Sequence, residues 1–389
     1  MREYPYLDQQ MKQQVEQDIM KGGALRVIYR DEVIYDNVFG YADAEERIPM
    51  GPDTIFRLYS MTKPITAAAL MILYDRGQVD LYDPVSRYLP GFRNQKVWRN
   101  GVLEPVVREA TILDLLTMTS GLVYPGQESG PGEIMQELFD AFYAGVEQGK
   151  AFSTYEMCNR IGEQPLICQP GECWHYGTSA DIVAGVIEVI TGKRYGDYLK
   201  EEIFNPLGMV DTDFWVPAEK RARFAKKYIR NAEGNLVPCD IQHLGVAYQY
   251  EKRPEFEIGG AGLVSTMEDY SRFAGMLLHE GSYCGRHILS KHAVRFMRTD
   301  HLTPEQAKTY DWESVRGYGY GCLMRVLKNV TGADAGYPGE FGWDGWTGNH
   351  FLIDPANRLI MIYLKQVAEG VDQRPIHLMK QIIYGTMLD

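Results

Sequence analysis

Several features that would assign a functional class at once are missing from this sequence. The N-terminus has no apolar run of the kind that a secretory signal needs. The longest strongly apolar stretch, residues 65–73, is too short to cross a bilayer. The sequence therefore predicts a cytoplasmic protein with no membrane span.

Cysteine is scarce, with six residues in a chain of 389. No C-x-x-C motif occurs, and a chain this long does not depend on a disulfide framework. Cys168, Cys173 and His175 form the one tight Cys/His cluster, but no fourth ligand follows them. We expect buried free thiols there in preference to a structural zinc, and the sequence indicates no metal site.

Common nucleotide and hydrolase motifs are also absent. The sequence contains no G-x-S-x-G nucleophile elbow, no Walker loop and no completed G-x-G-x-x-G fingerprint. The 40 basic residues against 52 acidic ones give a net charge of −12. That charge repels phosphate backbones, so nucleic acid is excluded as an expected partner.

The composition is that of a globular protein with a large core. Hydrophobic residues make up 45% and charged residues 24% of the chain. Strand patterns lie near both ends, at residues 24–29, 33–39, 263–265, 319–327, 350–353 and 359–364. Helices are expected at residues 9–21, 60–76, 112–117, 133–145, 178–191, 195–203 and 372–387. This order predicts one mixed sheet built from both ends of the chain, with a helical insertion between them.

One motif suggests covalent chemistry. Ser60 and Lys63 form the single S-x-x-K in the chain, and Pro64 places them at the start of a helix. Residues three apart share a helix face, so Lys63 can reach the Ser60 hydroxyl and take its proton or stabilise an anion. The alternative is an N-cap serine beside a lysine that extends to solvent, and the motif alone does not decide between them.

Two later segments support the catalytic interpretation. Tyr176 follows a Pro/Gly-rich loop and precedes an apolar helix, and a tyrosine near an ammonium can act as a base. On its own, such a tyrosine is more often a packing residue. Residues 342–348 are glycine-rich and border a strand, which lets a ligand approach the backbone, although a plain turn is the alternative.

Together these segments resemble the serine β-lactamase and penicillin-binding-protein superfamily. The sequence is most similar to the class C β-lactamase-like carboxylesterases, the family-eight esterases. The resemblance covers nearly the whole chain, at residues 56–66, 83–90, 115–122, 170–176, 259–266, 318–321 and 341–354. Several matches in the same order are far more specific than any one motif.

The resemblance implies a β-lactamase/transpeptidase-like α/β (α+β) fold. A central antiparallel sheet would be flanked by helices, with an inserted all-helical lobe. The domains would be a discontinuous α/β unit of residues 1–82 and 228–389 and a mainly helical unit of residues 83–227. The active site would lie in the cleft between them.

It also implies catalytic roles. Ser60 is the expected nucleophile, Lys63 assists its deprotonation, and Tyr176 is the general base that later activates water. The backbone N–H groups of Ser60 and Trp346 would form the oxyanion hole. No cofactor and no metal is needed.

The sequence departs from the β-lactamase pattern at two motifs. Thr178 stands where β-lactamases usually have asparagine, which weakens a contact to a substrate amide. The third motif is Trp343, Asp344 and Gly345, with residues 346–348 as the alternative. Neither segment contains the usual cation. An indole cannot pair with a carboxylate, and Asp344 is expected to add negative charge nearby.

The pocket is therefore expected to suit a neutral or apolar acyl ester. Tyr124 and Trp174 are candidate lining residues, although loop aromatics also simply pack. His350 is a candidate substrate contact, but a histidine in a strand is more often structural.

These expectations favour a serine carboxylesterase that works through an acyl-enzyme. Three alternatives stay open. The first is another chemistry on the same site: β-lactamase, D-amino-acid peptidase, amidase or acyltransferase activity. The second is a non-catalytic acyl- or penicillin-binding sensor, and the third is a fold with no relevant site. The sequence leaves the ester or amide substrate and the oligomeric state open.

Overall fold

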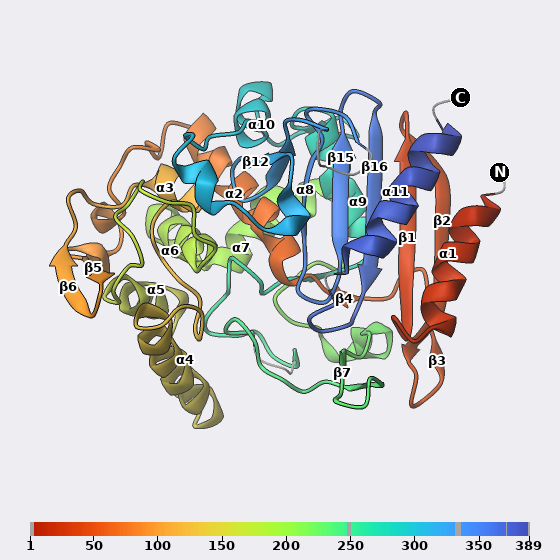
Figure 1. The fold of residues 1–389 in the computed structure, drawn as a ribbon, viewed down its shortest axis with the longest axis horizontal. Helices are drawn as coiled ribbons and strands as arrows, with labels where there is room; N and C mark the ends of the chain where they lie inside the picture. Colours follow the sequence, from red (N-terminus) through yellow and green to blue (C-terminus); the bar gives the residue numbers. More distant parts are fainter. Residues whose placement is uncertain (1–3, 247–249, 331–335, 371, 388–389) are drawn as a thin grey trace.

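A computed structural model describes residues 4–246, 250–330, 336–370 and 372–387 of the chain (Figure 1). Its main sheet has eight antiparallel strands in the order β12-β13-β14-β15-β16-β1-β2-β3. These strands are β1 (Gly22–Tyr29), β2 (Glu32–Asp43), β3 (Ile48–Pro49), β12 (Tyr318–Tyr320), β13 (Arg325–Leu327), β14 (Phe341–Asp344), β15 (His350–Asp354) and β16 (Leu359–Lys365). Strand β1 pairs with β16, with Val27 opposite Met361. The prediction of one sheet built from both ends of the chain is confirmed, but the described sheet is antiparallel and not mixed.

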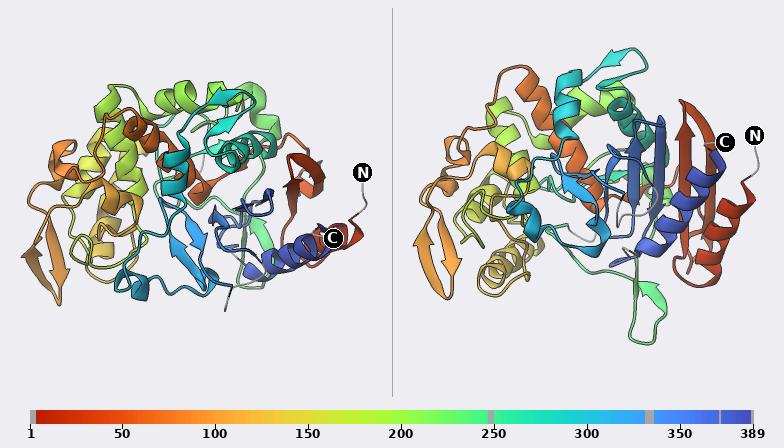
Figure 2. Two further views of the ribbon diagram at one scale, coloured as in Figure 1. Left: turned by 90° about the horizontal axis from the view of Figure 1, so that it is seen from above. Right: turned by 45° about the horizontal axis from the view of Figure 1, so that its top comes forward.

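Successive side chains of β16 point to opposite faces of the sheet, and both faces are covered by helices. All seven residues of β16 are buried. Leu359, Met361 and Tyr363 join one hydrophobic cluster with α1 (Pro5–Glu16) and α11 (Gln373–Met387). Ile360, Ile362 and Leu364 point the other way, into a larger cluster with α2 (Lys63–Asp75) and α9 (Met267–Leu278). Helices α1 and α11 lie side by side on their face of the sheet (Figure 2).

The hairpin of β1 and β2 turns at Arg30 and Asp31, which both have positive φ angles, 50° and 70°. A two-residue turn of this kind matches the twist of its strands. The predicted strand at residues 319–327 is instead two strands, β12 and β13, because the chain reverses between them at Leu323, where φ is 57°.

The remaining helices surround the larger cluster. They are α3 (Ile112–Leu116), α4 (Pro131–Glu147), α5 (Thr154–Gly162), α6 (Ser179–Thr191), α7 (Tyr195–Leu199), α8 (Asn205–Leu207) and α10 (Lys291–Met297). Four short two-stranded sheets complete the described fold: β4 (Phe56–Arg57) with β9 (Val264–Ser265), β5 (Lys96–Arg99) with β6 (Val102–Pro105), β7 (Tyr228–Arg230) with β8 (Leu236–Pro238), and β10 (Ser282–Tyr283) with β11 (Arg286–His287).

The middle of the chain is not purely helical, because it contains the β5–β6 hairpin. All four residues of β6 are exposed, so that strand forms by pairing and not by burial of an apolar face. Division of the chain at residues 82/83 and 227/228 stays a prediction. No helix in the described ranges is long and apolar enough to cross a membrane.

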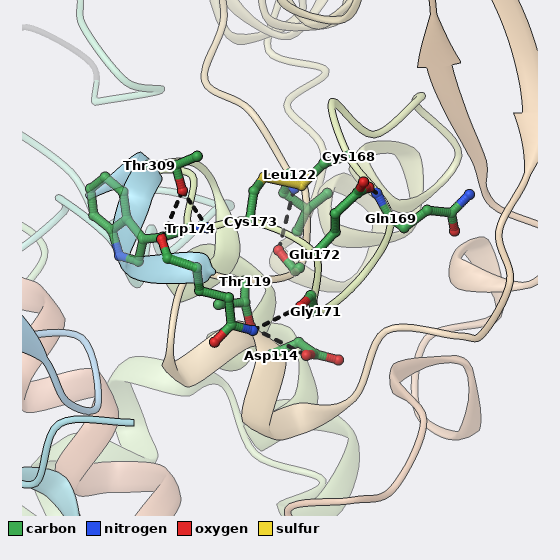
Figure 3. Close-up of a disulfide and its surroundings, with 12 residues drawn as sticks. Asp114, Thr119, Leu122, Cys168, Gln169, Gly171, Glu172, Cys173, Trp174 and Thr309 are labelled. Atoms are coloured by element: carbon green, nitrogen blue, oxygen red, sulfur yellow. Dashed lines mark hydrogen bonds between the residues drawn. A yellow bond between two sulfur atoms is a disulfide. The ribbon is translucent and has the colours of Figure 1, made fainter. Parts of the chain in front are cut away.

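The expectation of free thiols at Cys168 and Cys173 is wrong, because the two residues form a disulfide (Figure 3). The chain turns at Gly171, where φ is 83°, and this turn brings the two Cα atoms to 6.5 Å. That separation lies within the range that disulfides span. The Gly171 N–H also donates to the Thr119 carbonyl at 2.8 Å, which ties the loop to its neighbour.

Candidate active site

Ser60 lies on a short 3₁₀ turn, Tyr59–Thr62, that leads directly into α2. Tyr59, the residue before it, has a φ of 46°, a left-handed conformation that costs a non-glycine residue about 1–3 kcal/mol. Long-range backbone contacts hold this segment. The Leu58 N–H donates to the Leu263 carbonyl at 2.9 Å, and the Asn349 side chain donates to the Arg57 carbonyl at 2.7 Å. The turn that carries Ser60 is therefore fixed from both sides.

Lys63 is fully buried beneath Ser60. Its Nζ donates to Ser60 Oγ at 3.0 Å and to the Gly260 carbonyl at 2.8 Å. The same Nζ lies 4.6 Å from the centre of the Tyr176 ring. The structure thus brings together the three residues that the sequence assigned to catalysis.

Tyr176 lies in the loop before α6 and is held by aromatic neighbours. Its hydroxyl oxygen accepts a hydrogen bond from Trp343 Nε1 at 3.0 Å. Trp174 stacks on its ring at 6.0 Å, and Tyr124 meets it edge-on at 5.5 Å. The sequence placed Trp343 against substrate, but it did not anticipate this bond to Tyr176.

A cavity of about 330 Å³ opens beside these residues. Its lining includes seven residues expected at the site: Ser60, Tyr124, Tyr176, Trp343, Asp344, Gly345 and Trp346. Seven further lining residues were not anticipated: Gln127, His243, Leu244, Trp312, Ser314, Val315 and Arg325. Most of the latter come from loops, where no periodic pattern predicts the direction of a side chain.

Three expected substrate contacts are not among the lining residues. Thr178 is completely buried, and its hydroxyl donates to the Val123 carbonyl at 3.4 Å. Trp174 lies behind Tyr176, and His350 is buried on β15. Two of them contact lining residues, since Trp174 stacks on Tyr176 and the His350 ring bonds to Asp344 and Arg325.

Asp344 does not present a free negative charge, contrary to the expectation from the sequence. Its carboxylate accepts hydrogen bonds from both terminal nitrogens of the Arg325 guanidinium, Nη1 to Oδ2 and Nη2 to Oδ1, the latter at 3.1 Å. The same carboxylate pairs with His350 Nδ1 at 2.6 Å. Burial alone would raise the pKa of Asp344, but Arg325 and His350 hold it well below its usual range. Burial lowers the pKa of His350, which keeps that ring neutral. The charges at this wall of the cavity therefore cancel.

Gly345 is required by close packing against the segment that precedes Ser60. A Cβ atom at this position would lie 2.4 Å from the Leu58 carbonyl oxygen. The next residue, Trp346, packs edge-on against Tyr59 at 5.1 Å and stacks on His243 at 4.0 Å. The backbone of Trp346 is thereby held close to the turn that carries Ser60.

A search of protein families matches residues 7–382 to the model described as Beta-lactamase. The chain belongs to the β-lactamase family. Esterase EstB of Burkholderia gladioli is 32% identical over 369 residues, which cover 90% of this chain and 87% of EstB. Lovastatin esterase of Penicillium rubens is 28% identical over 361 residues, which cover 84% of this chain and 83% of that protein.

Solved structures show the same fold. EstCE1, described as a hydrolase with promiscuous acyltransferase activity, superposes with a TM-score of 0.80 at 24% identity. The match covers 98% of each chain. The predicted β-lactamase/transpeptidase-like fold is confirmed. The family is one of serine hydrolases with esterase members.

Proposed function

We propose that this protein is a serine carboxylesterase that acts on small esters with a neutral or apolar acyl group. The observation that carries the proposal is the hydrogen bond from Lys63 Nζ to Ser60 Oγ, beside Tyr176, at the base of an aromatic cavity. This arrangement can activate a serine hydroxyl without metal or cofactor.

In the proposed first step, Ser60 Oγ attacks the ester carbonyl carbon. Its proton passes to Tyr176, with Lys63 stabilising the charge, and then to the departing alkoxide, which leaves as the alcohol. The backbone N–H groups of Ser60 and Trp346 would hold the oxyanion. In the second step Tyr176 takes a proton from water, the hydroxide attacks the acyl-enzyme, and Ser60 recovers its proton as the acid leaves.

Trp343 supports the role of Tyr176 in this scheme. An indole N–H that donates to the phenolic oxygen stabilises negative charge on that oxygen, as hydrogen bonds to a charged form do. It also fixes the direction of the remaining lone pair. Trp343 thus takes the place of the cation of the β-lactamase motif without attracting a substrate carboxylate.

The cavity supports the choice of substrate. Its wall is mainly aromatic and aliphatic, with Trp312, Leu244 and Val315 beside the tyrosines and tryptophans of the motifs. The one guanidinium in the wall, that of Arg325, is paired with Asp344. Within the described residues, this wall offers no unpaired cation to a penicillin or peptide carboxylate.

The position of the cavity supports a site between the two proposed domains. Ser60 and Trp343 belong to the unit of residues 1–82 and 228–389. Tyr124, Gln127 and Tyr176 belong to residues 83–227, and all five line the same cavity.

The test compares p-nitrophenyl butyrate with the β-lactam nitrocefin. We expect turnover of the ester, at least tenfold slower turnover of nitrocefin, and loss of ester turnover in Ser60→Ala. Tyr176→Phe should retain the fold and lose most of kcat. A Ser60→Ala variant with wild-type rate would refute the proposal. Intact mass after reaction with a fluorophosphonate distinguishes a non-catalytic acyl-binding protein, which labels without turnover.

A further inference from the structure

Asp181 is a buried carboxyl group next to the proposed catalytic pair. It lies in the first turn of α6, five residues after Tyr176, and is 1% exposed. Its Oδ1 accepts the Gly260 backbone N–H at 2.6 Å. None of the motifs recognised in the sequence includes it.

Gly260 connects this carboxyl group to Lys63. Its N–H donates to Asp181, and its carbonyl accepts from Lys63 Nζ at 2.8 Å. A Cβ atom on Gly260 would lie 2.7 Å from Asp181 Oδ1. A larger residue at this position would displace the Asp181 carboxyl group. Through its bond to the Gly260 N–H, Asp181 anchors the backbone whose carbonyl holds Lys63.

The hydrogen-bond partners and nearest rings of Lys63 supply no carboxylate. Its hydrogen-bond acceptors are a hydroxyl and a carbonyl, and its nearest rings are those of Tyr176 and Tyr124. None of these groups is a carboxylate. A buried ammonium is costly unless an opposite charge lies nearby.

Among the residues that the structure describes, the thiol and phenols around Asp181 supply no second cation. Cys158 on α5 donates its thiol to the Asp181 carbonyl at 3.2 Å, and burial raises the pKa of that thiol. Tyr195 on α7 and Tyr124 are buried phenols whose pKa values are raised by burial. Burial raises the pKa of Asp181 to about 7, against the opposing charge of Lys63 and the Gly260 hydrogen bond.

We propose that Asp181 is a positioning residue for the Ser60–Lys63 pair. Its carboxylate anchors the Gly260 backbone and supplies the negative charge opposite the Lys63 ammonium. It does not touch substrate. This assignment rests on the proposed hydrolase function, and it adds a residue that determines the pH at which the site is active.

The test is Asp181→Asn, because an amide oxygen can still accept the Gly260 N–H but carries no charge. The wild type should lose kcat/KM as the pH falls through about 7, because protonation of Asp181 removes the opposite charge. The variant should be slower by about tenfold or more at neutral pH, with nearly unchanged KM. Its kcat/KM should lack the loss centred near pH 7.

Asp269→Asn is the matched control. Asp269 is also buried in the first turn of a helix, also accepts a backbone N–H, and also has a pKa raised by burial. It is not among the residues that line the cavity. We expect this control to keep the wild-type kcat/KM and pH profile. Gly260→Ala should also slow turnover, because the added Cβ displaces the Asp181 carboxyl group.

Labelling of Ser60 by a fluorophosphonate separates the two hypotheses. If the wild-type serine does not label, the hydrolase function fails and the role of Asp181 fails with it. If the wild type labels and a folded Asp181→Asn variant labels at the same rate and pH dependence, only the role of Asp181 is refuted. Should the asparagine variant not fold, an unchanged rate in Gly260→Ala refutes it equally.

Discussion

The Arg325–Asp344 pair gives the sharpest prediction of stability. Arg325 is only 4% exposed and Asp344 16% exposed, so removal of one partner leaves the other charge desolvated. Breaking a buried pair in this way costs about 3–5 kcal/mol, a large part of the roughly 5–15 kcal/mol that stabilises a domain. We therefore expect Asp344→Ala to lower the free energy of unfolding by about 3–5 kcal/mol at neutral pH.

The pH dependence of this stabilisation follows from the direction in which folding shifts the pKa of Asp344. Because the folded protein holds the pKa of Asp344 well below its usual range, the stabilisation is present above the unfolded pKa of about 3.9. It is lost as the pH falls below that value toward the folded pKa. The difference between wild type and Asp344→Ala should be constant from about pH 8 to pH 5 and should shrink in stronger acid.

The assay is equilibrium urea unfolding followed by tryptophan fluorescence. The double variant Arg325→Met, Asp344→Leu is the control, because it removes both charges and should recover most of the loss. Recovery is measured against each single variant in a double-mutant cycle. If Asp344→Ala costs less than about 1 kcal/mol and instead raises KM, Asp344 is a substrate contact and the reasoning is refuted.

Three further predictions concern the site and its loop. Trp343→Phe removes the N–H that donates to Tyr176. Loss of one hydrogen bond, worth about 1 kcal/mol, should lower kcat about fivefold with little change in KM; an unchanged kcat would show that this bond does not contribute to catalysis. Gly345→Ala places a Cβ 2.4 Å from the Leu58 carbonyl and should lower both the melting temperature and kcat; wild-type values for both would contradict the packing. Serines at Cys168 and Cys173 should lower the free energy of unfolding by about 2 kcal/mol, from loss of a short closed loop; equal urea midpoints would oppose this.

The sequence predicted the elements with strong patterns. Strands β1, β15 and β16 and helix α6 lie within two residues of their expected bounds, because each has a clear apolar pattern, whereas β2 runs four residues further than expected. Helix α9 was missed, although Thr266 caps it by accepting the Asp269 N–H at 3.2 Å. Its first turn carries two acidic residues, a start signal that could have been used.

The sequence predicted the parts of the site that lie within one motif. It did not predict the parts that depend on contacts between separate strands. Ser60 and Lys63 are three residues apart on one turn, so their contact follows from local geometry. The neutral wall at Asp344 depends on β13, whose Arg325 comes from another strand of the sheet. His350 could have been placed, because it lies directly opposite Asp344 in the β14–β15 register.

The β1–β16 pairing has a consequence for biosynthesis. Residues near the start of the chain find their strand partners more than 300 positions later, since Gly23 lies opposite Lys365. Contacts over such distances form slowly and only after the later segment is available. The turn that carries Ser60 is held by Asn349, which is synthesised late. A ribosome-bound chain therefore carries the proposed nucleophile long before it carries the strands and the Asn349 side chain that hold the turn of that serine in place.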